Sequence, residues 1–146
     1  MARRALALDI QRASRATHIP SDARLRAWSH AALARTATVT LRYVGESEAR
    51  RLNRAYRGKD YATNVLTFIY DDTPGLSGDI VICAPVVARE AKAQGKGVAA
   101  HHAHLLVHGL LHLQGFDHER SDEAVLMERR ERRILARLGF GDPYAA

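Results

Sequence analysis

The stretch that decides the fold and the chemistry of this chain is His108-Gly109-Leu110-Leu111-His112-Leu113-Gln114-Gly115-Phe116-Asp117-His118. Residues four apart lie on one face of a helix, so His108 and His112 can direct two imidazoles at one point. Gly115 is a natural end for this helix, because glycine tolerates the left-handed backbone of a C-terminal cap. The chain can then fold back and bring His118 to the same point. Three neutral nitrogens with an open fourth position are typical of a catalytic zinc site.

The same spacing argues against two other kinds of zinc protein. A structural zinc site is normally closed by a fourth ligand, usually with thiolates, and Cys83 is the single cysteine. The layout His-x-x-x-His-x-x-Gly-x-x-His also occurs in the metzincin proteases, which carry a glutamate after the first histidine as general base. Here that position is Gly109. The stretch therefore predicts metal binding without the base of a protease. The alternative is a helix whose histidines are only solvated or half-buried.

The composition is that of one globular domain with a basic charge. The chain has 146 residues, 47% of them hydrophobic and 26% charged, with a formal net charge of +6. This charge suits a polyanionic partner such as RNA, although many basic proteins bind no nucleic acid. No apolar run approaches the roughly 18 residues of a membrane span. The short apolar stretch at the N-terminus is interrupted by Asp9, so no signal peptide is expected. With one cysteine, these features predict a cytoplasmic protein.

Hydrophobic periodicity predicts an α+β fold with about four strands of mixed direction and about five helices. The helix with the histidines should pack against the sheet. The strand at 63–70 is largely apolar and is expected in the centre of the sheet. The predicted strands are 5–10, 38–44, 63–70 and 78–83, and the predicted helices are 21–35, 46–56, 85–93, 98–113 and 121–138.

The remaining histidines of the central helix are expected to play supporting parts. His104 lies one turn before His108, so these two form a rival ligand pair. A helix face drifts by about 40° with each step of four residues, and His118 needs the histidines nearest the helix end. His101, His102 and His104 are therefore expected at the surface or hydrogen-bonded around the ligands.

Two groups of arginines have open interpretations. Arg50, Arg54 and Arg57 recur at helical spacing with Arg51 beside them, a pattern that either follows a phosphate backbone or forms a solvated face. On the last helix, four arginines at 129, 130, 132 and 133 alternate with Glu128 and Glu131, which predicts a solvated face with salt bridges more than an RNA site. The predicted inward set of that helix is Leu126, Met127, Ile134, Leu135 and Leu138.

The chain resembles the YbeY family over roughly residues 40 to 143. These are bacterial endoribonucleases that are specific for single strands, mature ribosomal RNA and bind one zinc through three histidines. Two departures are mild: Thr67 stands where the family usually has serine, and Ile69 where it often has proline. The resemblance is carried by 104–113, Gly115-Phe116-Asp117-His118, Leu52-Asn53, Tyr56-Arg57-Gly58-Lys59-Asp60, 62–66 and Gly78-Asp79-Ile80-Val81-Ile82.

The resemblance implies roles for particular residues. One Zn²⁺ per chain would be held by His108, His112 and His118, with His108 also counted among the catalytic residues. The arginine of the Tyr-Arg-Gly-Lys block points into the family's cleft, which gives Arg57 a catalytic role in binding the scissile phosphate and stabilising developing charge. Less direct candidates are Lys59 for the phosphate chain, Asp79 for the shape of the site, Asp117 for orienting an imidazole (or as a turn residue), and His104.

The composition predicts a single domain over 1–146, and the resemblance implies a zinc-dependent endoribonuclease that matures the 3′ end of 16S ribosomal RNA and acts in ribosome quality control. Zinc would activate a water or polarise the phosphate. The expected partners are single-stranded and ribosomal RNA, the small ribosomal subunit and assembly proteins, with no membrane and no DNA. The alternatives are a non-catalytic zinc-containing ribosome-assembly factor and a zinc hydrolase of another substrate class.

Overall fold

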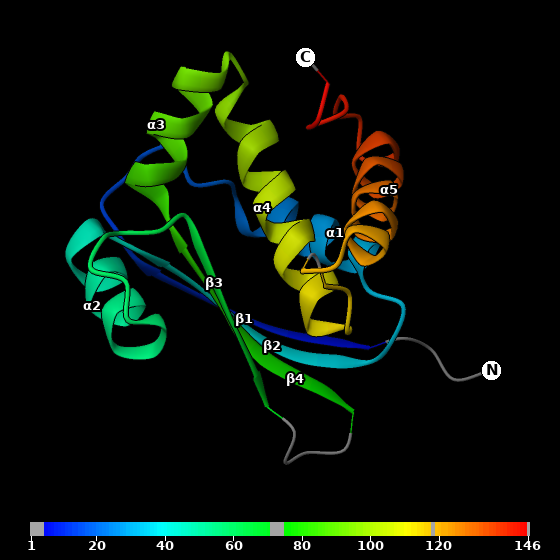
Figure 1. Cartoon of the computed structure of the whole chain (residues 1–146), viewed down its shortest axis with the longest axis horizontal. Helices are drawn as coiled ribbons and strands as arrows, with labels where there is room; N and C mark the ends of the chain where they lie inside the picture. Colours follow the sequence, from blue (N-terminus) through cyan, green and yellow to red (C-terminus); the bar gives the residue numbers. More distant parts are fainter. Residues whose placement is uncertain (1–4, 71–74, 118, 146) are drawn as a thin grey trace.

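The computed structural model describes residues 5–70, 75–117 and 119–145. Residues 71–74, between the third and fourth predicted strands, and the predicted ligand His118 lie outside this part of the chain. The helices and strands follow each other closely along the sequence (Figure 1). In chain order they are β1 Leu6–Ala13, α1 Asp22–Ala32, β2 Ala37–Val44, α2 Glu46–Arg57, β3 Val65–Tyr70, β4 Leu76–Cys83, α3 Ala84–Gln94, α4 Val98–Leu113 and α5 Ser121–Arg137.

The four strands of the described residues form one mixed sheet in the order β1-β2-β4-β3. The first three are parallel, and β3 is antiparallel to β4 with Val65 opposite Ile82. The prediction of an α+β fold with a mixed sheet is confirmed, but the prediction that 63–70 is a central strand is wrong. Strand β3 is an edge strand. Its first part packs under helices, with Leu66 buried and Val65 and Phe68 partly buried, whereas Ile69 and Tyr70 are exposed.

Helices cover the two faces of the sheet unequally, and each covered face has its own apolar core (Figure 1). The larger core joins one face to α1, α4 and α5, with Trp28, Leu106, Leu110 and Met127 among its members. The smaller core lies under α2 on the opposite face and contains Ala49, Val44, Leu66, Val81, Cys83 and Val86. Helix α4 runs across the middle of the larger layer, so its C-terminal end lies over the edge of the sheet at β3.

Two glycines allow α4 to approach the sheet closely. A Cβ atom on Gly78 of β4 would lie 2.3 Å from Leu113 Cδ2 and 2.4 Å from the carbonyl oxygen of Phe68. A Cβ atom on Gly109 would lie 3.2 Å from two side-chain atoms of Ile80. The residue after the first histidine thus faces the sheet at close range, and a glutamate there would push helix and sheet apart. This contact gives a physical reason for glycine at the position where the metzincins carry their base.

The predicted ends of α4 are confirmed. The helix runs from Val98 to Leu113, and Gly115 has φ 98°, in the left-handed region. The N–H of Phe116 donates to the carbonyl of Leu111 at 3.1 Å, which closes the helix end as expected for a glycine cap. Helix α1 also begins as predicted, with Ser21 as its N-cap, but it ends at Ala32, earlier than the predicted 35.

Several side-chain placements differ from prediction. Leu126, expected to face inward, is 53% exposed, because the inward face of α5 passes through Met127, Ile134 and Leu135 instead. Neither His101 nor His102 lies at the surface; both are buried, because α4 is enclosed on most of its circumference. Within the described residues, none of the helices has the length and apolar character needed to cross a bilayer.

Candidate active site

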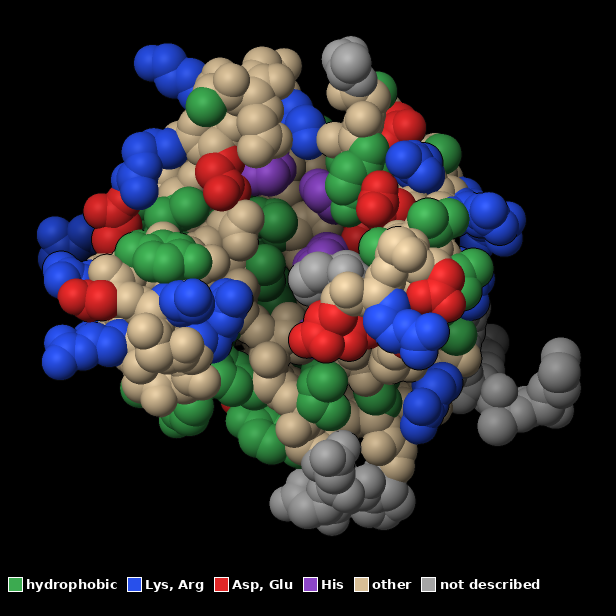
Figure 2. Space-filling model, viewed as in Figure 1, with side chains coloured by type: hydrophobic (Ala, Val, Ile, Leu, Met, Phe, Trp, Pro, Cys, Tyr) green, Lys and Arg blue, Asp and Glu red, His purple; other side chains and the backbone are tan. Residues whose placement is uncertain are grey.

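A cavity of about 570 Å³ opens where the end of α4 meets the edge of the sheet. His108 and His112 line it from α4, and Arg57 lines it from the end of α2. Figure 2 shows histidine side chains in a hollow near the middle of this face, with Lys and Arg side chains on both sides of it. The fold therefore brings the predicted arginine and two of the three predicted histidines to one cavity, although about 50 residues separate them in the sequence.

Strand β3 and the residues before it form a wall of this cavity. Thr63, Asn64 and the next four residues, through Phe68, all line it. Successive side chains of a strand point to opposite faces of a sheet, so six consecutive residues can line one cavity only along the strand's edge. The edge of β3 can line the cavity because, among the described residues, no strand pairs with β3 on its outer side. The cavity continues past the helix end, where Asp117 and Glu119 line it.

The hydrogen bonds of the two histidines fix their tautomers. His112 Nδ1 lies 3.0 Å from the carbonyl oxygen of Phe116, which only accepts, so His112 Nδ1 carries the proton. His108 Nδ1 lies 2.8 Å from Oε1 of Glu131 and likewise donates to it. In each neutral ring the lone pair is then on Nε2. Zinc-binding histidines typically show this arrangement, in which the second ring nitrogen donates to a carboxylate or a backbone carbonyl.

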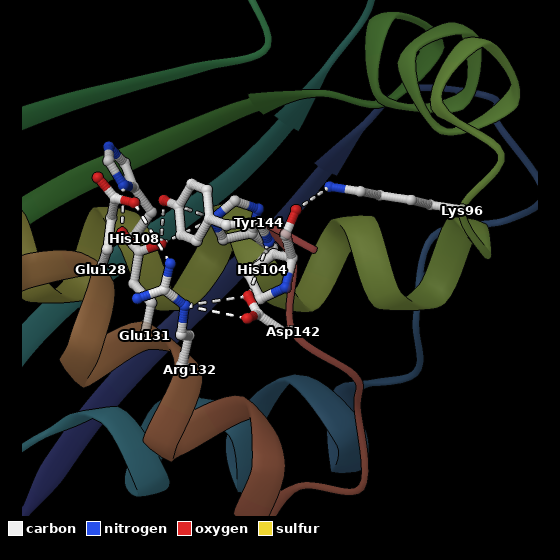
Figure 3. Close-up of polar contacts among 9 residues, drawn as sticks. Lys96, His104, His108, Glu128, Glu131, Arg132, Asp142 and Tyr144 are labelled. Carbon is white, nitrogen blue, oxygen red and sulfur yellow. Dashed lines mark hydrogen bonds and ion pairs between the residues drawn. The ribbon is translucent and has the colours of Figure 1, made fainter. Parts of the chain in front are cut away.

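Glu131 of α5 is the buried centre of a polar group that also contains His104, His108 and Tyr144, called here the Glu131 cluster (Figure 3). Its side chain is 0% exposed. Burial alone raises the pKa of a carboxyl group, but hydrogen bonds from His104, His108 and Tyr144 outweigh burial and lower the pKa of Glu131 to about 2. The carboxylate is thus ionised and accepts a hydrogen bond from His108.

The prediction that Glu131 belongs to a solvated face is wrong. The alternation with arginines suggested exposure, but Glu131 stands four residues after Met127 and three before Ile134, in the middle of the inward face of α5. That position was visible in the sequence and was the signal that could have located this residue. Asn64, Tyr56 and Glu119, which line the cavity, were also not singled out as site residues.

The donor set of the cavity fits a zinc ion. Both described histidines line the cavity with their Nδ1 protons held by acceptors. Within the described residues, no group of three His, Cys, Asp or Glu side chains is arranged to hold a metal ion. The third predicted ligand, His118, follows directly after Asp117 of the cavity wall but lies outside the described part of the chain. The complete ligand set therefore remains a prediction.

Arg57 owes its position to the end of α2. It is the last residue of the helix, and Gly58 follows with φ 69° in the left-handed region. The N–H of Gly58 donates to the carbonyl of Arg54 at 3.1 Å, the bond of an αL helix cap. The N–H of Lys59 donates to the carbonyl of Asn53 at 3.3 Å. Arg57 is exposed and is the one cationic side chain among the described residues that line the cavity.

The stripe of arginines before Arg57 is partly engaged within the protein. Arg50 donates to both carboxylate oxygens of Asp60, at 2.8 and 3.0 Å. This bidentate pair connects α2 to the loop after it, and both partners are exposed. Arg51 and Arg54 are exposed and do not line the cavity. The geometry thus separates Arg57 from the other three arginines.

The less direct candidates lie at different distances from the cavity. Lys59 is exposed just beyond the end of α2 and is not part of the cavity wall. Asp79 accepts a hydrogen bond from the hydroxyl of Tyr70 and also lies outside the wall. Its neighbour Ile80 faces α4, so Asp79 points to the opposite face of the sheet. Asp117 lines the cavity, and His104 belongs to the Glu131 cluster behind it.

Two imidazoles with fixed tautomers, one arginine and two carboxylates around an open cavity are typical of a metal-dependent hydrolase with an anionic substrate. Comparison with known proteins agrees. The family model described as endoribonuclease YbeY matches residues 10–139. The chain belongs to the endoribonuclease YbeY family, which confirms the resemblance noted in the sequence.

Individual relatives match over most of their length. A protein from Aromatoleum aromaticum named endoribonuclease YbeY is 61% identical over 143 residues, which cover 96% of this chain and 93% of the relative. One from Nitrosomonas europaea with the same name is 52% identical, covering 95% and 85%. A solution structure of a Thermotoga maritima protein has a TM-score of 0.58 at 22% identity and covers 95% of this chain and 99% of its own. At that identity the likeness supports the fold alone.

Proposed function

We propose that this protein is a zinc-dependent endoribonuclease that cleaves single-stranded RNA and acts on ribosomal RNA, at the 3′ end of the 16S molecule. The observation that carries the proposal is the cavity shared by Arg57, His108 and His112. Membership of a family named for endoribonuclease activity supports the reaction class. The ribosomal substrate, the small subunit and its assembly proteins as partners, and one zinc per chain extend the proposal beyond the cavity itself.

Different residues of the cavity have different roles in the proposed phosphodiester cleavage. A zinc ion held by His108, His112 and His118 would supply Lewis-acid stabilisation of negative charge. Arg57 binds the scissile phosphate across the cavity and neutralises charge that develops in the transition state. Glu131 and the carbonyl of Phe116 hold the two described imidazoles in the orientation and tautomer that ligation needs.

Tyr56 supports the preference for single strands. Its side chain is 68% exposed, and it lines the cavity one residue before Arg57. Its ring packs edge-to-face on Phe68, with centroids 5.0 Å apart, which fixes its position. An exposed aromatic ring beside a phosphate-binding arginine offers a stacking surface to an unpaired base, and a base within a duplex is not available for such stacking.

The two alternatives make different demands on these residues. A peptide-cleaving zinc hydrolase of the metzincin type needs a glutamate after His108, and Gly109 lies too close to Ile80 for one. A non-catalytic assembly factor needs zinc only to join the loop after α4 to the helix, so that Arg57 is dispensable. Arg57 therefore separates the enzyme from the assembly factor.

The test compares the wild-type protein with Arg57→Ala, Arg57→Lys and His112→Ala, using zinc content by mass spectrometry and cleavage of a single-stranded RNA oligonucleotide. Arg57→Ala should retain its zinc and its fold but cleave about 10²-fold more slowly, the usual cost of one lost charge-stabilising donor. Arg57→Lys should recover part of the rate, and His112→Ala should lose zinc and cleavage together. Arg137→Ala, which removes an arginine outside the cavity wall, is the matched control.

Two results would contradict the proposal. Cleavage by Arg57→Ala at the wild-type rate would show that Arg57 takes no part in the reaction. A zinc-loaded, nuclease-free wild-type protein that cleaves no RNA would favour the assembly factor. Assays with a peptide and with single-stranded DNA complete the comparison of substrate classes.

A further inference from the structure

The chain segment Asp142-Pro143-Tyr144 is fastened to α4 and α5 beside the Glu131 cluster (Figure 3). Arg132 Nε lies 3.1 Å from both carboxylate oxygens of Asp142, and the Arg132 guanidinium lies over the Tyr144 ring, 5.3 Å from its centroid. Lys96 Nζ donates to the carbonyl of Pro143 at 2.7 Å. The N–H of Tyr144 donates to Asp142 Oδ1 at 2.8 Å. These contacts hold the tyrosine in place although 40% of it is exposed.

The hydroxyl of Tyr144 reaches the buried carboxylate that supports His108. It donates to Oε2 of Glu131, and His104 Nε2 lies 2.8 Å from the same oxygen. The other oxygen, Oε1, accepts from His108 Nδ1 at 2.8 Å. Two donors on Oε2 and one on Oε1 fix the plane of the carboxylate. The direction of Oε1, and with it the orientation of the His108 ring, therefore depends on what Oε2 is bonded to.

We propose that Tyr144 and Glu131 are positioning residues for His108, which act together to set the zinc affinity of the cavity. The inference rests on the zinc site of the proposed function. Glu131 acts directly, through the hydrogen bond to His108 Nδ1, and Tyr144 acts through Glu131. The segment after α5 thereby takes part in the active site without lining the main cavity, whose described wall contains neither residue.

The expected effects follow from this order of contacts. Loss of a hydrogen-bond partner of a zinc-binding histidine typically weakens metal binding by about 10- to 100-fold, which is the expectation for Glu131→Gln. Tyr144→Phe removes only the hydroxyl, because the ring that packs on His104 and under Arg132 remains. Its effect on zinc affinity should have the same sign and be smaller, a loss of several-fold.

Tyr70→Phe is the matched control. The hydroxyl of Tyr70 also donates to a carboxylate, that of Asp79, but on the far face of the sheet. This variant removes the same kind of hydrogen bond, and neither Tyr70 nor Asp79 belongs to the described wall of the cavity. Zinc affinity should therefore equal that of the wild-type protein.

The experiment measures the zinc dissociation constant by competition with a chromophoric chelator and the thermal midpoint of the metal-free protein. Positioning predicts weaker zinc binding in Tyr144→Phe and Glu131→Gln, with cleavage of single-stranded RNA restored in Tyr144→Phe when zinc is raised to saturation. A purely structural role predicts a lower midpoint of the metal-free protein with unchanged zinc affinity. That result for Tyr144→Phe overturns the proposal, even if Glu131→Gln fails to fold.

The outcomes also distinguish this inference from the proposed function. If the wild-type protein cleaves RNA and Tyr144→Phe binds zinc as tightly as the wild-type protein, the proposed function stands and the positioning role is overturned. A wild-type protein that binds zinc and cleaves no RNA, with zinc affinity reduced in both variants, overturns the function and supports the positioning role. A wild-type protein that binds no zinc overturns both.

Discussion

The histidines of α4 have different chemistry because the helix directs them toward different neighbours. His112 and His108 line the cavity, whereas His104 turns toward Glu131 behind it. His101 Nε2 lies 2.9 Å from Glu90, whose other partner, Asn64, belongs to the cavity wall. His102 is fully buried, and its Nε2 lies 3.0 Å from Nδ1 of His18. One helix thus carries candidate metal ligands, their support and a core residue.

The burial of His102 has a consequence for stability at mildly acidic pH. Burial first, and then His18 and His101, lower the pKa of His102 from 6.5 to about 3. Below pH 6.5 the imidazole of His102 therefore binds a proton in the unfolded chain but not in the folded protein. The free energy of unfolding falls as the pH drops from about 6.5 toward 3. The contribution is about 1.4 kcal/mol for each pH unit within this window.

His102→Gln should remove this contribution. Urea unfolding at pH 7 and pH 5 should show a smaller loss of stability in the variant than in the wild-type protein. His18 contacts the His102 ring directly, and Tyr43 packs on it with ring centroids 5.6 Å apart. Both residues are present in the variant and in the wild-type protein, so the two proteins differ only at position 102. An equal loss of stability in both proteins would show that His102 titrates normally.

At the scale of residues, spacing predicted contacts within one helix and missed contacts between helices. His108 and His112 are four apart on α4, so their shared direction follows from helix geometry alone. The contact between His108 and Glu131 joins α4 to α5 and depends on how these helices pack, which no local pattern encodes. The same limit explains why His102 was expected at the surface or hydrogen-bonded around the ligands and not in the core: its burial comes from β2 and from the segment around His18.

At the scale of elements, the bounds of α4 and the location of most strands were predictable, but the order of the strands was not. Strand β3 is apolar because α4 and α2 lie on its two faces, a situation that produces the same sequence pattern as a central strand. Gly78 illustrates the opposite case. Only its neighbour Asp79 was singled out, as a candidate for the shape of the site, whereas Gly78 itself lets the end of α4 lie close to the sheet.

Gly78→Ala should therefore destabilise the protein strongly. The added methyl group would meet both Leu113 Cδ2 and the backbone oxygen of Phe68, and the backbone cannot move without disturbing the pairing of β3 with β4. Overpacking of this kind costs on the order of 1–3 kcal/mol, measurable by urea unfolding. Gly141→Ala is the control, since nothing lies within 4 Å of a Cβ atom there. Equal stability of the two variants would contradict this account of α4 packing.

At the scale of the whole molecule, zinc should couple the site to the stability of the fold. His108 and His112 lie on a buried helix, and the third predicted ligand lies beyond the helix end. A metal that binds only the folded protein stabilises it by about 2.7 kcal/mol at a concentration 100-fold above its dissociation constant. For a chain of this size the melting temperature should then rise by roughly 5–10 °C.

Calorimetry with zinc and with excess chelator tests this coupling. The wild-type protein should melt at a lower temperature in chelator, and His112→Ala should melt at the same temperature in both conditions. A chelator-dependent shift that persists in His112→Ala would place the stabilising metal elsewhere. The net charge of +6 follows from the sequence alone, but the position of the charged side chains relative to the cavity depends on the fold.

The wall that β3 contributes to the cavity has a consequence for how the site tolerates change. Thr63 to Phe68 line the cavity in succession, before and along the edge of β3. Because successive side chains of a strand alternate in direction, we infer that peptide groups as well as side chains face the cavity there. Peptide N–H and C=O groups are the same whichever residue carries them, except for the missing N–H of proline. Substitutions along this edge would therefore alter the shape of the rim while leaving much of its hydrogen-bonding capacity intact. The hydrogen-bonding character of this rim is therefore set more by the path of the strand than by the residues that it carries.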